Sequence, residues 1–474
     1  MHRPLDMKVL IISTNQEKTP FAVVPIGALK VVAALRQAGH QVDFLDLCFC
    51  RNIRRSIKKR IKSFAPDIVG LSIRNLDNCA YDQPRAFFDS DRNIVQAIRD
   101  CSEAQIVIGG SAVSIMPEEL ADYLGVDYAI AGEGEESLPA LLQALQSNTG
   151  LQEVPGLLRR NGSSWLQSPR ACLGHLQGLP LQAYDCIDLA RYFAQGGLAA
   201  VQTKRGCPFS CIYCVYPALE GRLPRLVPPG ECVQEMERIV KDTGRSDFFF
   251  VDGVFNYPTD HAAAVCEEII RRRLNVRWLA YCNPVGLDKD LAELFKASGC
   301  AGIELGLDAA TEKMLCKLKK GFTLENIKSS YVALNLAGIP FAVFLLFGGP
   351  EETYADWEQT QKNLQGFGSA NAVFASLGIR IYAQTCMHDI AVEQGYVTQE
   401  MSLLQPCFYI SPQLLEDDPV QRLDALARRD PAWSTPTDWN SLRVRAIQWL
   451  LAKYRVIPCW RDIRNYGAYM RRQG

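Results

Sequence analysis

Three cysteines stand close together in the segment GCPFSCIYC, residues 206–214. Their spacing is Cys207-x3-Cys211-x2-Cys214, and the next cysteine along the chain is Cys232. Thiolates hold zinc ions or iron-sulfur clusters, and one loop with this spacing can bind three corners of a four-iron cluster. The iron without a protein ligand can then chelate a substrate, as the open position of a catalytic metal site does. The alternative is a structural zinc site with Cys232 or a more distant cysteine as fourth ligand.

The composition is that of an ordinary globular protein. The 474 residues are 48% apolar, and 51 basic against 52 acidic residues give a net charge of -1. This length predicts two or three domains, and the charge balance argues against a DNA partner. Neither a spanning run of about 18 apolar residues nor a signal peptide is present, so we expect no transmembrane segment and a cytoplasmic location. There the 17 cysteines stay reduced, which favours a metal site over a disulfide.

Residues 1–146 alternate between apolar β-rich runs and helical stretches. The runs KVLIIS, VDFLDL, DIVGLSI, QIVIGG and DYAIAG predict five strands of a doubly wound, Rossmann-like parallel sheet. Ligands of such sheets bind beyond the carboxyl ends of the strands. Those ends carry the small and polar segments STN, SIRNLDN, GGSAV and GEGEES.

The rest of the chain predicts a linker and two further domains. Turn residues dominate 147–197, which we expect to be a linker. Residues 198–386 hold six strand candidates separated by helices, two short of an eight-fold barrel, and predict a partial (β/α)6 barrel. Residues 387–474, with DWNSLRVRAIQWLLAKYR, predict a small, mainly helical cap. The expected fold class is therefore α/β throughout, with this helical addition.

In this setting the sequence resembles the radical S-adenosylmethionine enzymes. GCPFSCIYC follows the first barrel strand, with an aromatic residue before the last cysteine, and FVDGVFN, GIELGLD, FLLFGGPEET and GIRIYAQT are similar to the family's later motifs. In the last motif Ala383 and Gln384 replace the family's Pro-Gly. The resemblance implies a 4Fe-4S cluster on Cys207, Cys211 and Cys214 rather than zinc. It assigns the following residues to S-adenosylmethionine: Tyr213, Asp252, Gly253, Glu304, Gly348, Gly349 and Arg380.

The front domain resembles that of the cobalamin-binding subfamily, and the likeness covers about residues 8–410. It carries PIGALKVVAALRQAGHQVDFLDL and GGSAVSIMPEELADYLGVDYAIAGEGEESLPALL, followed by LPLQAYDCIDLARY in the linker. The resemblance implies cobalamin as a further cofactor. The cobalamin residues it points to are Thr14, Asn15, Arg74, Asn75, Gly109, Gly110, Ser111, Gly132, Glu133, Gly134 and Glu135.

The cobalt is expected to have no histidine ligand from the protein. None of the five histidines stands in the D-x-H-x-x-G motif with which many cobalamin proteins supply one. We expect Arg74, in SIRNLDN at the end of the third strand, to lie near the lower face of the corrin. A charged guanidinium is a poor metal ligand and would there disfavour six-coordinate Co(III). The alternative is that Arg74 pairs with a corrin amide or with Asp77.

The resemblance implies a methyltransferase that moves a methyl group from methylcobalamin to an unactivated carbon or phosphorus centre after formation of a 5'-deoxyadenosyl radical. Its substrate would be a small molecule, lipid or peptide, and its electron donor an external protein such as flavodoxin or ferredoxin. The alternatives are a cyclase or rearrangement enzyme, a tRNA methylthiotransferase and a non-catalytic cobalamin sensor. Tyr281, Tyr382 and His388 are further candidates for acid-base or positioning roles.

The basic segment RNIRRSIKKRIK, residues 51–62, bears on the RNA alternative. Its isoleucines recur every four residues, as in the buried stripe of a helix. We therefore expect its basic residues to form a solvated helix face rather than an RNA-binding site.

Overall fold

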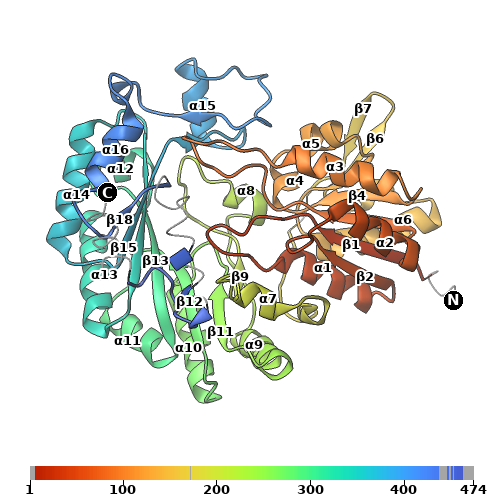
Figure 1. Ribbon diagram of the computed structural model, residues 1–474, viewed down its shortest axis with the longest axis horizontal. Coiled ribbons are helices and arrows are strands. Elements are labelled where there is room, and N and C mark those ends of the chain that lie inside the picture. Colours follow the sequence, from red (N-terminus) through yellow and green to blue (C-terminus); the bar gives the residue numbers. More distant parts are fainter. Residues whose placement is uncertain (1–5, 171, 437–445, 448–449, 452, 463–474) are drawn as a thin grey trace.

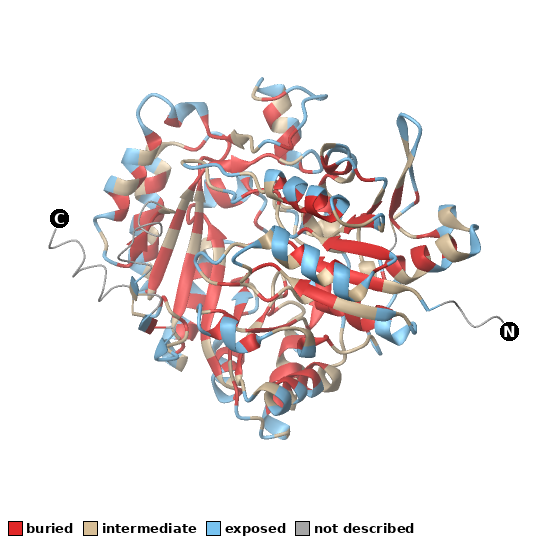
Figure 2. Cartoon of the chain, turned by 45° about the vertical axis from the view of Figure 1, so that its right-hand side comes forward, coloured by how far each residue is buried: buried red, intermediate tan, exposed pale blue. Residues whose placement is uncertain are grey.

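The computed structural model describes residues 6–170, 172–436, 446–447, 450–451 and 453–462. Two sheets stand side by side, each flanked by helices, with the amino-terminal sheet in red to yellow and the second in green to blue (Figure 1). Buried residues follow the strands of both sheets (Figure 2). In the described part of the chain, no helix is long and apolar enough to cross a membrane.

The first sheet has the strand order β2-β1-β3-β4-β5-β6-β7. Its first five strands are parallel and confirm the predicted doubly wound sheet. They are β1 Lys8–Ser13, β2 Gln41–Asp46, β3 Ile68–Ser72, β4 Gln105–Gly109 and β5 Tyr128–Ile130. Its helices are α1 Ile26–Gln37, α2 Ile53–Phe64, α3 Phe88–Arg99, α4 Ser111–Ile115, α5 Pro117–Leu124 and α6 Gly134–Ser147.

Helix α2 is the basic segment noted in the sequence. The Asn52 side chain caps it by accepting a hydrogen bond from the Arg55 amide, which satisfies an otherwise free helical N–H. Ile57 and Ile61 are buried, and the helix ends at Ala65 in a left-handed conformation. The isoleucine stripe therefore packs on the sheet as predicted, and the basic side chains lie on the outer face.

The segment expected to be a linker contains two strands. β6 Leu157–Asn161 and β7 Ser164–Gln167 form a hairpin whose first strand pairs antiparallel with β5. Gly162 and Ser163 form its two-residue turn, and Gly162 has a φ of 63°. A two-residue turn with glycine in its first position is a hairpin signal, because glycine tolerates positive φ. Beyond this hairpin the segment contains η1 Leu151–Glu153, η2 Tyr184–Cys186 and α7 Leu189–Phe193.

The second sheet is the predicted partial barrel. Its order is β18-β15-β14-β13-β12-β11-β8, with all neighbours parallel. The six predicted strands are β8 Ala199–Val201, β11 Asp247–Phe250, β12 Arg277–Cys282, β13 Cys300–Asp308, β14 Phe341–Phe347 and β15 Ala372–Leu377. The outer helices are α9 Pro229–Thr243, α10 Thr259–Arg271, α11 Lys289–Ala297, α12 Glu312–Lys317, α13 Leu324–Ala337 and α14 Tyr354–Phe367.

Smaller elements complete the barrel domain and the segment after it. Near the cysteine loop are β9 Lys204–Arg205, α8 Tyr216–Glu220 and β10 Arg225–Leu226. The segment after the barrel contains α15 Cys386–Glu393, β17 Phe408–Tyr409, η3 Pro412–Leu414, α16 Pro419–Ala427 and β18 Trp433–Ser434, and β16 Ile379–Arg380 directly precedes it. Among the described residues of this segment the helices are longer than the strands, in agreement with the predicted mainly helical cap. The predicted helix in DWNSLRVRAIQWLLAKYR falls largely outside the described residues.

Candidate functional site

The cysteine loop follows the first barrel strand, as predicted. The Cys207 amide donates to the Gly221 carbonyl at 3.0 Å, and the Ile212 amide donates to the Leu318 carbonyl at 3.2 Å. Gly206 enters the loop with a φ of 96°, and a Cβ there would lie 2.3 Å from the Leu223 carbonyl oxygen. A glycine is therefore required at the point where the chain turns into the loop.

The three thiols are suited to a cluster. Burial raises the pKa of Cys207 and Cys211, and raises that of Cys214 to about 12. In the described ranges, no three His, Cys, Asp or Glu side chains converge as the ligands of one metal ion would. Three soft sulfur donors on one loop are the ligands of a four-iron cluster that keeps one iron open, so this donor set fits a cluster.

A buried ion pair lies beside the cysteine loop. Lys320 Nζ is 2.5 Å from Asp308 Oδ2, and the Tyr213 hydroxyl donates a hydrogen bond to the same carboxylate. The Lys320 ammonium also lies over the rings of Tyr213 and Phe322. Sequence reasoning missed Asp308 and Lys320 as site residues. Asp308 could have been found, because it is the last residue of the strand motif GIELGLD, where ligands of parallel sheets bind.

Glu304 lies deeper in the barrel than Asp308. Its Oε1 accepts a hydrogen bond from Trp460 Nε1 at 2.8 Å, and Tyr281 is its second hydrogen-bonding partner. Burial raises the pKa of this carboxyl to about 7, although both partners act to lower it. Its assignment to the ribose of S-adenosylmethionine stays a prediction, and the contact that the structure shows is with Trp460.

Asp252 and Gly253, also predicted to bind S-adenosylmethionine, contact other residues of the barrel domain. Asp252 accepts hydrogen bonds from the amide and hydroxyl of Thr203 at 2.8 and 2.6 Å, which joins β8 to the end of β11. Gly253 stands against Tyr216, since an added Cβ would lie 3.3 Å from that ring. Their contacts to S-adenosylmethionine stay predictions.

The glycine pair after β14 and the arginine of β16 also form hydrogen bonds within the protein. The Gly348 and Gly349 amides donate to Glu352 Oε2 at 2.5 and 2.8 Å. Arg380 donates to Asp77 Oδ2 at 2.9 Å and to the carbonyls of Ile381 and Leu403. The guanidinium of Arg380 thus joins the two domains, and its role toward S-adenosylmethionine stays a prediction as well.

A cavity of about 370 Å³ lies between the two domains. Gln202, Arg205, Tyr216 and Leu219 line it from the barrel side. Thr14 and Asn75 are not in the lining, and Thr14 instead bonds the Ser72 carbonyl. The predicted cobalamin residues that line it are Asn15, Arg74, Gly109, Gly110, Ser111, Gly132, Glu133, Gly134 and Glu135.

The glycines of this cavity leave room for a large group. A Cβ on Gly109 would meet only the Ile130 carbonyl, at 3.7 Å, and one on Gly132 would meet nothing within 4 Å. Gly110, with a φ of 106°, lies so close to the backbone of Ile73 that a Cβ would come within 2.4 Å of its oxygen. The site therefore fits a bulky cofactor, and no histidine of the described residues lines it.

Arg74 projects into the cavity from the end of β3. Burial among protein atoms lowers its pKa, while the nearby hydroxyls of Tyr216 and Tyr281 act in the opposite direction. Across the residues that the structure describes, no carboxylate forms an ion pair with it. Asp77, named above as an alternative partner, is bound to Arg380 and to the Cys79 amide instead.

Buried charges join the domains beside the cavity. Arg205 forms ion pairs with Glu135 and, at 3.2 Å, with Glu133. Arg225 bonds Glu133 at 2.7 Å, and Lys30 Nζ donates to the Gln202 side chain at 2.9 Å. The carboxylates of Glu133 and Glu135, predicted to bind cobalamin, thus pair with arginines of the barrel domain.

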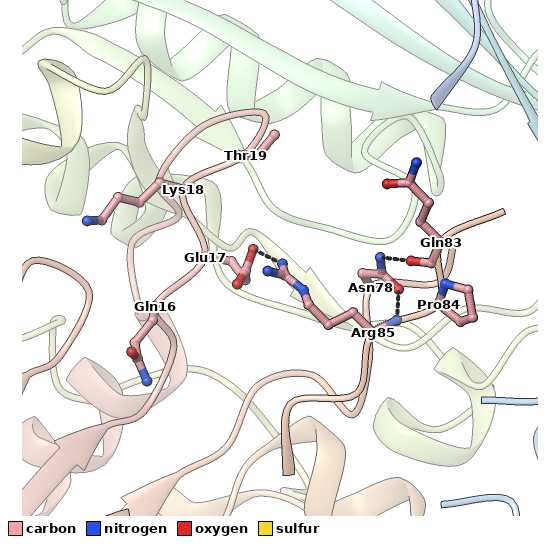
Figure 3. A pocket seen from close by; sticks show the side chains of 8 residues that line it. All are labelled: Gln16, Glu17, Lys18, Thr19, Asn78, Gln83, Pro84 and Arg85. Carbon is pink, nitrogen blue, oxygen red and sulfur yellow. Dashed lines mark hydrogen bonds and ion pairs between the residues drawn. The ribbon is translucent and has the colours of Figure 1, made fainter. Parts of the chain in front are cut away.

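A second hollow, of about 630 Å³, opens at the same edge of the first sheet (Figure 3). It lies between the loop after β1 and the loop after β3, and the Glu17–Arg85 ion pair joins these loops. The Asn78 side chain donates to the Gln83 carbonyl at 2.8 Å and accepts from the Arg85 amide at 2.9 Å. No glycine stands among its lining residues, which distinguishes it from the glycine-lined cavity.

Comparisons with known proteins agree with both halves of the site. The B12 binding domain family matches residues 13–142, and the Radical SAM superfamily matches residues 201–364. Tryptophan 2-C-methyltransferase of Streptomyces laurentii is 28% identical over 437 residues, covering 79% of this chain and 72% of the relative. An anaerobic magnesium-protoporphyrin IX monomethyl ester cyclase of Rubrivivax gelatinosus is 25% identical over 377 residues, covering 75% and 65%.

Solved structures of cobalamin-binding radical S-adenosylmethionine enzymes resemble this chain over nearly its whole length. Two structures of the radical S-adenosylmethionine methyltransferase TsrM from Kitasatospora setae superpose with a TM-score of 0.86, at 25% and 26% identity, covering 99% of each chain. One contains cobalamin and a 4Fe-4S cluster, and the other contains tryptophan and an analogue of S-adenosylmethionine. The chain belongs to the cobalamin-binding radical S-adenosylmethionine enzymes, whose cofactors are a 4Fe-4S cluster, S-adenosylmethionine and cobalamin. Within this class its relatives place it with the methyltransferases.

Proposed function

We propose that this methyltransferase acts on a carbon atom of a small planar aromatic substrate of the tryptophan type. The observation that carries the proposal is the aromatic interior of the barrel. Phe249, Tyr281, Phe344 and Phe374 are less buried than the residues before and after them in their strands. Because side chains alternate across a strand, these four face the interior, while their neighbours pack under the helices.

The four rings form a continuous surface across neighbouring strands. Ring centroids lie 5.1 Å apart for Phe249 and Tyr281, 6.2 Å for Tyr281 and Phe344, and 5.0 Å for Phe344 and Phe374. Flat aromatic groups bind well to such surfaces through offset and edge-to-face contacts. The likeness to a tryptophan methyltransferase over most of the chain supports the same substrate class.

The chain would supply the positioning and the shielding. Cys207, Cys211 and Cys214 would hold the cluster, and the glycine-lined cavity would hold cobalamin. When bound, the cluster with S-adenosylmethionine supplies electron-transfer and radical chemistry, and cobalamin supplies methyl transfer. The ring-lined interior would orient the substrate and exclude water, so that the reacting atoms meet at a fixed distance.

The test is anaerobic reconstitution of the protein with iron, sulfide and cobalamin, followed by incubation with reductant, S-adenosylmethionine and tryptophan. We expect S-adenosylhomocysteine and a methylated amino acid in equal amounts by mass spectrometry. Methylation of a peptide or lipid extract, with none of tryptophan or smaller indoles, would contradict the substrate class. Formation of 5'-deoxyadenosine with no methylated product would favour the cyclase alternative, which the cyclase relatives keep open.

Arg74 carries a second proposal, that it lies against the lower face of the corrin without binding cobalt. Two observations support this role: Arg74 lines the cavity, and no carboxylate among the described residues forms an ion pair with it. We expect Arg74→Ala to change the absorption spectrum of bound cobalamin, because water can then reach the lower face, and Arg74→Lys to change it less. The control is Arg85→Ala, which breaks a surface ion pair on the same loop. An unchanged spectrum in Arg74→Ala would contradict the role.

A further inference from the structure

Residues 455–461 cross beneath the barrel, at the amino ends of its strands. Arg455 Nη2 lies 2.9 Å from Asp247 Oδ2, at the first residue of β11. Arg277, the first residue of β12, donates to the Arg455 carbonyl at 3.2 Å. Asn371, just before β15, donates to the Arg461 carbonyl at 3.0 Å. The segment is therefore fixed at both ends to the end of the barrel opposite the cysteine loop.

Between these two attachments, Trp460 enters the barrel where its strands carry small residues. Ala342 of β14 pairs in register with Glu304 of β13 and with Ala372 of β15. Gly302 leaves no room for a side chain, since a Cβ there would lie 2.9 Å from Pro458 Cγ and 3.1 Å from Trp460 Cη2. Trp460 is 6% exposed and packs against the two alanines. The small side chains leave a space that the indole fills.

The indole also reaches the residues that face the substrate space. Phe344 and Phe374 pack against the small cluster formed by Trp460, Ala342 and Ala372. The indole N–H bonds Glu304, which is only 4% exposed. Glu304 in turn contacts Tyr281. One side chain from beneath the barrel thus bonds the carboxyl group of its interior and belongs to the cluster against which two of the rings pack.

We propose that Trp460 is a positioning and specificity-determining residue of the active site. Its ring is the floor of the substrate space, and its N–H holds the Glu304 carboxyl toward Tyr281. The identity of the substrate rests on the proposed function, whereas the contact between Trp460 and Glu304 can be tested without any substrate.

The first experiment measures this contact in the full-length chain before cofactors are added, because cobalamin and the cluster would quench fluorescence. Subtracting the emission of Trp460→Phe from that of the unmodified protein isolates the signal of Trp460 among the seven tryptophans. We expect the emission of Trp460 to change with pH, with a midpoint near 7. In Glu304→Gln this pH dependence should disappear. Trp165→Phe, in the exposed hairpin, is the matched control and should leave the titrating signal intact.

The titration can be assigned to Glu304 because its titratable neighbours do not ionise in that range. Burial raises the pKa of Tyr281 well above its usual value and raises that of Cys459 to about 12. Of the groups in the described part of the chain that face Glu304, only the carboxyl itself has its pKa near 7. A titration that persists in Glu304→Gln would overturn the contact.

The second experiment separates the ring from its N–H in the reconstituted enzyme. We expect Trp460→Gly to lower kcat/KM for the substrate at least tenfold and to increase relative activity on longer aromatic substrates. Free indole should restore part of the activity by filling the vacated space. Benzofuran, which has nearly the same shape but no N–H donor, should restore less. The unmodified enzyme with each additive controls for inhibition at the substrate site.

The outcomes distinguish this proposal from the proposed function. A kcat/KM within twofold of the unmodified enzyme in Trp460→Gly, with unchanged substrate preference, would overturn the role of Trp460. Equal rescue by indole and benzofuran would overturn the role of the N–H and leave the ring as a floor alone. If the unmodified enzyme methylates no aromatic substrate, the proposed function fails, but the fluorescence titration still decides whether Trp460 holds Glu304.

Discussion

The carboxyl edges of the two sheets are built in opposite ways. At the edge of the first sheet, glycines leave a cavity open, and the space beside Gly109 and Gly132 is free of close contacts. At the edge of the barrel, side chains already bind one another, as Asp308 does with Lys320 and Tyr213. The first edge is suited to a large cofactor recognised by its shape. The second provides defined ligands and charges, so single substitutions there should have the larger effects.

Loss of a cluster ligand gives the largest expected effect. Cys211→Ser replaces a soft thiolate by a hydroxyl, so we expect bound iron to fall sharply and methyl transfer to drop by a factor of about 1,000 or more. Iron analysis and the visible absorption of the reconstituted protein measure this directly. Cys232→Ser is the control, because Cys232 is a buried cysteine of α9 and should leave the iron content unchanged. Equal iron loss in both variants would contradict the assignment of the ligands.

The ion pair beside the cluster loop should dominate the stability of the barrel edge. Lys320→Met leaves the buried Asp308 carboxylate without its partner, which costs about 3–5 kcal/mol in typical cases. We expect a clearly lower unfolding temperature, with partial recovery when Asp308→Asn is added. Lys317→Met, which breaks the exposed pair with Glu351, serves as control and should have no measurable effect. Similar decreases in unfolding temperature for Lys320→Met and Lys317→Met would contradict the larger contribution of the Lys320–Asp308 pair.

A bulky residue in the glycine-lined cavity tests recognition by shape at the first edge. Gly109→Leu can be accommodated by the backbone but points a side chain into the cavity, so we expect cobalamin affinity to fall about tenfold or more, equivalent to about 1.4 kcal/mol. Equilibrium dialysis of cobalamin measures it. The control is Gly366→Ala in α14, where a Cβ meets nothing within 4 Å. Unchanged affinity in Gly109→Leu would place cobalamin elsewhere.

The smallest expected effect is a pH dependence of stability from Asp91. Burial raises its pKa to about 7, despite its hydrogen bond with Thr14. A carboxyl whose pKa is higher in the folded state stabilises the fold at low pH, and this contribution is lost as pH rises toward 7. Asp91→Asn should therefore flatten the decline of unfolding temperature between pH 4 and 7. Asp89→Asn, on the exposed side of α3, should retain the decline.

The elements of both sheets were predictable because their apolar runs and helical stripes have clear periods. The β6–β7 hairpin was missed although its Gly162-Ser163 turn is a local signal, since the surrounding residues have weak alternation. Asp308 could be inferred from its place at a strand end. Trp460 could not be, because its partner Glu304 lies 156 residues away and its space depends on small residues of three strands. Contacts of that kind arise only from tertiary packing.

The predicted cobalamin residues show the same limit. The place of the glycines at the cavity was predictable, because parallel sheets bind ligands at strand ends and a close approach requires small residues. Glu133 and Glu135 stand in the same motif, but their partners Arg205 and Arg225 belong to the barrel domain. A motif inside one domain cannot report which of its side chains the other domain will use.

The two domains are fastened on either side of the cavity that separates them. Arg380 and Asp77 hold one side, and Arg205 and Glu135 hold the other, all four with side chains at most 7% exposed. Such pairs are little weakened by salt, so the halves should not swing apart during turnover. Cobalamin would then be a long-term resident acquired while the halves come together, and its supply during synthesis would set how much active enzyme a cell contains.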